Sequence, residues 1–107
     1  MRWMFSDCSS LKKLNLSNFN TNNVTDMRDM LYGCSSLKEL NLSNFNIKNV
    51  TNMSWMFYGC STLKELNLPK FNNLKLINMS RMFSRCSDEL KNKIISENKK
   101  IKPDAFF

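Results

Sequence analysis

The sequence of 107 residues contains no histidine, only two glycines and two prolines, and no long apolar run. Without histidine, Ser-His-Asp and Cys-His triads, imidazole acid–base catalysis and zinc sites with a histidine ligand are excluded. The apolar runs are too short to span a membrane, and no charged segment followed by an apolar one marks a secretory signal. The low glycine and proline content is unusual for a chain with many tight turns.

The remaining composition indicates one ordered domain. Hydrophobic residues make up 42% of the chain, which is enough for a single core of modest size. Lysine and arginine number 16 against 9 acidic residues, so the formal net charge is +7. Asparagine occurs 16 times, and this excess requires a structural explanation.

A repeat of 26 residues accounts for most of the pattern. The four cysteines occupy one column of this repeat: Cys8, Cys34, Cys60 and Cys86. All eight methionines fall into two further columns, which are Met1, Met27, Met53, Met79 and Met4, Met30, Met56, Met82. Leucine and phenylalanine positions recur with the same period. The chain is therefore a repeat protein.

Each repeat predicts a short strand followed by a short helix. In the copy that spans residues 37–62, alternating polarity over Leu40–Leu42 favours a strand. The apolar spacing that follows is typical of a helical stripe, formed by Val50, Met53, Met56 and Phe57. Thr51 precedes Met53 as a suitable N-cap, and Gly59 follows the stripe where a left-handed residue is expected.

We therefore expect an α/β fold, a leucine-rich-repeat-like solenoid of about four 26-residue rungs with a C-terminal capping helix. Residues 1–86 would form the solenoid, and residues 87–107 the capping helix and tail. Ser87 is a suitable N-cap for that helix, and one apolar face would contain Leu90, Ile94, Ile95 and Ile101. Asparagines in equivalent columns would hydrogen-bond turn backbone or the neighbouring rung, and would adopt left-handed conformations in place of glycine.

The repeat phrase LxxLNLSNFNxxNVTxMxxMFxxCSSL resembles the BspA-like class of leucine-rich-repeat surface proteins of bacteria. The similarity covers residues 1–86. It departs from the common leucine-rich repeat at Phe19, Phe45 and Phe71, which stand where that repeat has its turn asparagine. The resemblance implies a bacterial cell-surface or secreted protein, sometimes adhesive, and it transfers no catalytic residue.

The start of the chain lies within a repeat, at the expected helix, and leaves the strand at Leu14–Leu16 as a bare edge. We expect either a fragment of a longer array or an edge that pairs with another chain, and we favour the fragment. The localisation is therefore unknown. It would be the cell surface if the array is exported, as the resemblance implies, or the cytoplasm if Met1 is the true start.

Solenoids commonly bind partners along the outward positions of their strands. The predicted interaction face consists of Lys13, Asn15, Ser17, Glu39, Asn41, Ser43, Glu65 and Asn67. It is polar, repetitive and without aromatic anchors, which favours a weak, extended or multivalent contact. Trp3 and Trp55 occupy a column that elsewhere holds aspartate and arginine, so we expect them to be partly exposed.

Other candidate sites have simpler interpretations. Cysteines separated by 26 residues cannot converge on one zinc ion, so a column of small buried thiols is expected rather than a metal site or a disulfide framework. Residues 70–107 carry 9 basic and 4 acidic side chains, with Lys99, Lys100 and Lys102 clustered. This cluster could bind a polyanion, although no nucleic-acid motif accompanies it.

The predicted function is a non-enzymatic module for protein–protein or surface interaction, without catalytic residues, metal or cofactor. A protein partner is possible, and so is self-association through the N-terminal edge. The alternatives are a structural spacer without a specific ligand and a basic module that binds polyanions.

Overall fold

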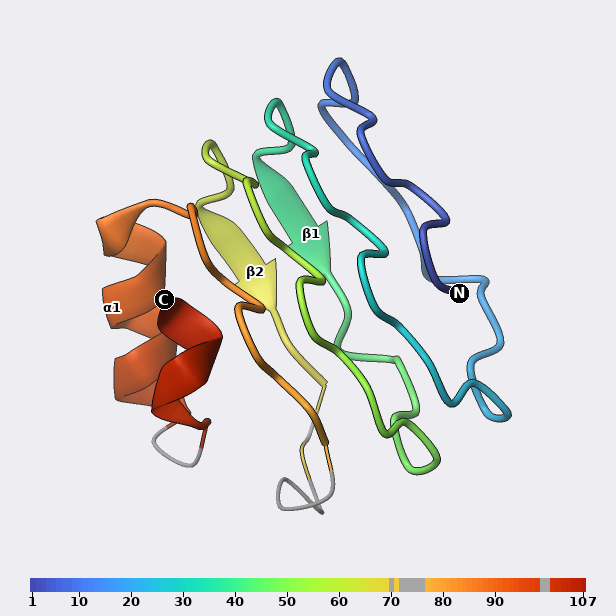
Figure 1. Cartoon of the computed structure of the whole chain (residues 1–107). Coiled ribbons are helices and arrows are strands. Elements are labelled where there is room, and N and C mark those ends of the chain that lie inside the picture. The colour runs from blue at the N-terminus through green and yellow to red at the C-terminus, as the bar shows by residue number, and fades with distance from the viewer. Residues whose placement is uncertain (70, 72–76, 99–100) are drawn as a thin grey trace.

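The computed structural model describes residues 1–69, 71, 77–98 and 101–107. Its elements are strand β1 (Glu39–Asn41), strand β2 (Glu65–Asn67), helix α1 (Asp88–Glu97) and the 3₁₀ helix η2 (Pro103–Phe106). The repeats lie side by side in chain order, and α1 and η2 lie beside the last of them (Figure 1).

Equivalent residues of neighbouring repeats pair in parallel. β1 and β2 form a two-stranded sheet in which Leu40 is the register partner of Leu66. Isolated parallel bridges join Asp26 to Asn52 and Asn52 to Asn78 on the other side of each repeat. The sequence period therefore sets the register of every pairing.

The predicted α/β fold, a leucine-rich-repeat-like solenoid of about four strand-plus-helix rungs, is wrong. The described residues hold only two three-residue strands and one α-helix, and that helix follows the last repeat. No strand forms at Leu14–Leu16, and the segment expected to be helical after Thr51 consists of turns.

Consecutive turns replace the expected helix because the backbone N–H groups alternate between two kinds of acceptor. The N–H groups of Met56 and Tyr58 donate to carbonyls three residues earlier, at Met53 and Trp55. The N–H group of Phe57, between them, donates instead to a carbonyl of the next repeat. We call the turn segments 1–8, 27–34, 53–60 and 79–86 the turn arms.

Left-handed residues make this alternation possible. Each turn arm has a positive φ at two positions, four residues apart, as at Trp55 (61°) and Gly59 (76°). The same columns include Trp3, Asp7, Asp29, Gly33, Arg81 and Arg85. An L-residue in this conformation costs about 1 kcal/mol or more, so the stacked structure must stabilise it. The chain thus needs few glycines because other residues are held in the left-handed region.

Asparagine side chains hydrogen-bond the backbone as predicted, but none of the described asparagines has a positive φ. The Oδ1 atom of Asn15 accepts from the Ser17 N–H, and that of Asn41 from the Ser43 N–H, each at 2.9 Å. Between repeats, Asn46 Nδ2 donates to Asn22 Oδ1 at 3.1 Å. The asparagine excess therefore serves turn formation and stacking rather than left-handed geometry.

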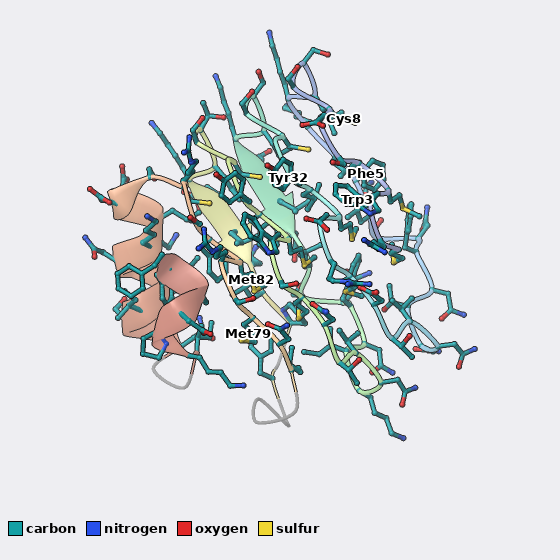
Figure 2. All side chains as sticks on the ribbon, viewed as in Figure 1. Trp3, Phe5, Cys8, Tyr32, Met79 and Met82 are labelled. Carbon is teal, nitrogen blue, oxygen red and sulfur yellow. The ribbon has the colours of Figure 1, made fainter. Side chains whose placement is uncertain are left out.

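The core lies between the strand side and the turn arm of each repeat. Its columns contain leucine, methionine, cysteine and phenylalanine, and Met53, Met56 and Phe57 have no exposed area. Phe57 stacks on Phe83 with ring centroids 5.5 Å apart. Met79 and Met82 continue the two methionine columns in the last repeat (Figure 2).

Helix α1 begins as predicted, because the Ser87 hydroxyl accepts a hydrogen bond from the Leu90 N–H at 3.2 Å. Leu90 and Ile94 are buried, whereas Ile95 is 46% exposed. The helix ends at Glu97, so Ile101 is buried outside it. The division of the chain into residues 1–86 and 87–107 stays a prediction.

The 3₁₀ helix η2 covers the last turn arm. Its carbonyls at Asp104 and Ala105 accept from the N–H groups of Arg81 and Phe83 at 2.9 and 2.7 Å. The Phe106 ring stacks on Phe83, with centroids 5.5 Å apart and planes at 18°. The tail thereby continues the hydrogen bonding and the aromatic stack of the repeats.

Replacing Gly59 with alanine tests the left-handed columns. A Cβ atom at Gly59 would lie 3.7 Å from its nearest neighbour, so space is available and only the φ of +76° opposes it. We expect Gly59→Ala to lower the free energy of unfolding by about 1 kcal/mol in urea titrations. Ser61→Ala, two residues later, is the control and should have little effect; equal effects would contradict the assignment.

Candidate functional site

A groove of about 1060 Å³ crosses the strand side of three repeats. All eight residues of the predicted interaction face line it, together with parts of Leu14, Leu16, Leu40 and Asn44. The structure therefore brings the predicted residues together in one concave surface. That this surface binds a partner stays a prediction.

The strands position the groove residues by alternation. In β1, Glu39 and Asn41 are exposed and Leu40 between them is buried; β2 repeats the pattern. The parallel register places Glu39 beside Glu65 and Asn41 beside Asn67. The first repeat continues the surface without a strand, joined by a weak hydrogen bond of 3.5 Å from the Lys38 N–H to the Lys12 carbonyl.

Two groove asparagines are fixed by their own turns. Because Oδ1 of Asn15 and of Asn41 accepts the N–H two residues later, each side chain has one orientation. Among the described residues, neither Nδ2 group donates a hydrogen bond, so both are available to a ligand. Pro69 has no N–H, so it cannot fix Asn67 in the same way.

The charge of the groove changes sign along its length. Lys13 of the first repeat is replaced by Glu39 and Glu65 in the next two. Lys93 of α1 lies 3.5 Å from Glu65, but both side chains are well exposed, so this ion pair contributes little stability. Within the described residues, Glu39 forms no ion pair and can meet a cation of a partner.

The tryptophans lie outside the groove, on the turn arms. Trp3 is 49% exposed and Trp55 is partly buried. Tyr32 stacks on Tyr58 at 4.8 Å, and the Arg81 guanidinium lies 5.1 Å from the centre of the Trp55 ring. We call Trp3, Tyr32, Trp55 and Tyr58 the aromatic row. Trp3 and Tyr32 are labelled in Figure 2.

The sequence reasoning missed the tyrosines of the aromatic row. A signal was present, because Tyr32 and Tyr58 are 26 residues apart and follow each other in one column. Serine occupies this column in the outer repeats, at Ser6 and Ser84, so the tyrosines do not recur in all four copies.

The cysteines are free thiols with a structural contact in common. The thiols of Cys34, Cys60 and Cys86 donate to carbonyls of the preceding repeat at 3.1 to 3.2 Å. These three are buried as predicted, whereas Cys8 is only partly buried. Burial raises the pKa of Cys34 to about 11 and that of Cys86 to about 12, and it also raises the pKa of Cys60. Burial therefore favours the neutral, unreactive form of Cys34, Cys60 and Cys86.

The other ionisable groups with shifted pKa values lie outside the groove. Hydrogen bonds from the Arg28 side chain, at 2.7 to 3.1 Å, lower the pKa of Asp26. Burial raises the pKa of Asp29. In the described part of the chain, no three cysteine and carboxylate side chains are grouped as metal ligands. Neither Asp26 nor Asp29 is part of the candidate site.

Two further features bear on partners. Within the described residues, the helices are too short or too polar to cross a lipid bilayer. Of the predicted basic cluster, Lys99 and Lys100 lie outside the described residues, and Lys102 donates from Nζ to the Ile77 carbonyl at 3.2 Å. The described part of this cluster is thus engaged in a contact with the last repeat.

Comparison with known proteins identifies a family. The family described as "Mycoplasma protein of unknown function, DUF285" matches residues 1–102. The chain belongs to the DUF285 family. No curated protein and no solved structure matches it. Membership of DUF285 is consistent with the interpretation of the chain as a repeat protein. It gives no specific support to the resemblance to BspA-like leucine-rich repeats.

The buried thiols predict a loss of stability at alkaline pH. The unfolded thiol ionises near its usual pKa of about 8.5, while that of folded Cys34 is raised to about 11. A raised folded pKa gives stability that is complete below the unfolded pKa and is lost as the pH rises toward the folded one. Each pKa unit corresponds to about 1.4 kcal/mol.

We therefore expect the melting temperature to fall between pH 9 and about 11, and to fall less steeply in Cys34→Ser, which keeps a donor that does not ionise in this range. The difference between the two slopes is the contribution of Cys34 alone. Identical slopes would show that Cys34 ionises equally in both states.

Proposed function

We propose that this DUF285 chain is a non-enzymatic interaction module that binds an extended protein segment along the groove. The observation that carries the proposal is the concave surface of about 1060 Å³ in which three repeats present equivalent polar positions. Because the surface crosses the repeats, a partner would lie across the strands rather than enter a deep pocket.

Periodic hydrogen bonding supports an extended partner. Equivalent residues of paired strands are about 4.8 Å apart, so β1 and β2 offer the amides of Asn41 and Asn67 at this step, and Asn15 of the first repeat continues the series without a strand. Two of these amides are held by their turns and lose little conformational freedom on binding. Many small contacts without an aromatic anchor give an affinity that depends on the number of repeats engaged.

The charge pattern defines the chemistry of the partner. A cationic side chain of the segment would face Glu39 and Glu65, and an acidic or polar one would face Lys13. The carboxylates argue against the groove as a polyanion site. A structural spacer without a ligand is the alternative that the binding experiment separates.

The proposal also includes a relationship to one class of bacterial surface proteins. The repeat phrase, with its phenylalanine and asparagine columns, supports placing this DUF285 chain near the BspA-like bacterial surface proteins. On this basis we propose that the partner is a protein met at a cell surface.

Selection from a phage-displayed peptide library tests the proposal without a known ligand. We expect lysine- or arginine-bearing peptides to be enriched on the immobilised chain and to bind saturably. The double variant Glu39→Arg/Asn41→Arg should weaken the selected peptides at least tenfold, because it reverses the groove charge and removes a fixed amide.

The matched control is Glu89→Arg/Asn92→Arg on α1, which makes the same charge change at exposed positions outside the groove. It should leave binding within about twofold. Equal loss in both double variants would indicate a general charge effect, and failure to enrich any saturable peptide would favour the spacer.

A further inference from the structure

Two arginines of the last turn arm lie over aromatic rings of the preceding one. The guanidinium carbon of Arg81 is 5.1 Å from the centre of the Trp55 ring, and that of Arg85 is 5.7 Å from the centre of the Tyr58 ring. These two rings are neighbours, with centroids 5.0 Å apart. Both guanidinium groups therefore meet the aromatic row from the side of the last repeat.

The repeat does not require a cation at either position. The column of Arg81 holds tryptophan or aspartate in the other repeats, and the column of Arg85 holds Gly33 and Gly59 in the two middle ones. Arg85 has a φ of 61°, a conformation that glycine adopts freely and other L-residues adopt only with strain. Because such strain is often retained at functional sites, the two arginines point to a role beyond the fold.

The charges of both arginines are available to a ligand. Both side chains are exposed, and within the described residues neither guanidinium forms an ion pair or donates a hydrogen bond to a protein group. The carbonyl of Asp104 accepts the backbone N–H of Arg81 at 2.9 Å, but the Asp104 carboxylate does not pair with it. A guanidinium that lies over a ring keeps the N–H groups in its own plane for other acceptors.

The contacts that remain open define the chemistry of the ligand. Tyr58 has Tyr32 stacked on it at 4.8 Å and Arg85 over its ring, so a base or a sugar ring finds little free aromatic surface there. The open groups are the N–H donors of two neighbouring guanidinium groups. One carboxylate, with two oxygens and a single charge, matches one guanidinium. A phosphate monoester has three terminal oxygens and close to two negative charges, so it can accept from both.

We propose that Arg81 and Arg85 together bind one phosphate monoester group. Trp55 and Tyr58 would hold the guanidinium groups in place, so little side-chain freedom is lost on binding. A soluble ester and a lipid headgroup both present this chemical group. The site lies on the turn arms and outside the groove, so it does not depend on peptide binding.

Titration of the full chain with methyl phosphate tests the site. NMR follows the backbone amides of residues 79–86 at constant ionic strength. We expect saturable shifts with a dissociation constant of about 1 to 10 mM, as a few charge-assisted hydrogen bonds at an exposed site provide. Acetate should bind at least about fivefold more weakly, because it has one charge and two oxygens.

Two double variants separate guanidinium recognition from general charge. Arg81→Lys/Arg85→Lys keeps the net charge but removes the planar donors, and it should weaken methyl phosphate at least about fivefold. The matched control, Lys38→Gln/Lys64→Gln, removes two charges from exposed positions on the strand side, and it should bind within about twofold because distant surface charges are screened. Full binding by the lysine pair, or equal loss in both double variants, would overturn the proposal.

Arg85→Gly separates binding from folding, because glycine occupies this column in the two middle repeats. We expect this variant to keep or raise the melting temperature, since the left-handed strain is relieved, and to bind methyl phosphate at least about fivefold more weakly. A lower melting temperature with unchanged binding would show that Arg85 serves the fold alone and would overturn the proposal.

Vesicles distinguish the two sources of phosphate. Co-sedimentation with phosphatidylcholine vesicles that contain phosphatidic acid, weakened in Arg81→Lys/Arg85→Lys, would identify the lipid headgroup. Binding of methyl phosphate without co-sedimentation would identify a soluble ester. If wild type binds neither probe, the proposal is overturned. None of these variants changes a groove residue, so the result is independent of the peptide selection.

Discussion

The fold depends on the alternation of backbone hydrogen bonds in the turn arms. One N–H group donates within its own turn and the next donates to the following repeat, as with Met56 to Met53 and Phe57 to Met82. In the turn arm 53–60 every N–H group donates a hydrogen bond, that of Ser54 to the Asn52 side chain, although the segment is neither helix nor sheet. This satisfaction allows an irregular backbone to border a core in which the flanking methionines have no exposed area.

Several unusual features of the sequence follow from this alternation. Two left-handed positions in each arm keep successive N–H groups pointing in different directions, and stacking holds even Trp55 and Arg81 there. The cysteine column adds a buried thiol donor to a carbonyl of the preceding repeat, as at Cys60 and Leu31. Asparagine side chains close the turns on the strand side, which leaves their amides toward the groove.

Much of the candidate site could be predicted from the sequence, because the 26-residue period and the alternation around Leu40 place Glu39 and Asn41 on one face. The fold class could not, since inward residues three and one apart, as in Met53, Met56 and Phe57, fit both a helix and consecutive four-residue turns. The positive φ values at Trp55 and Gly59 distinguish the turns from a helix, and the sequence pattern does not show them. The 3₁₀ helix η2 lies outside the repeat columns, so the 26-residue period alone does not place Phe106 on Phe83.

Scalar coupling across hydrogen bonds, measured by NMR on labelled protein, tests the alternation most directly. The structure predicts a correlation from the Gly59 amide nitrogen to the Ser84 carbonyl carbon, and from Phe57 to Met82. A correlation from Gly59 to the Trp55 carbonyl would instead indicate a helical turn arm and would contradict the account.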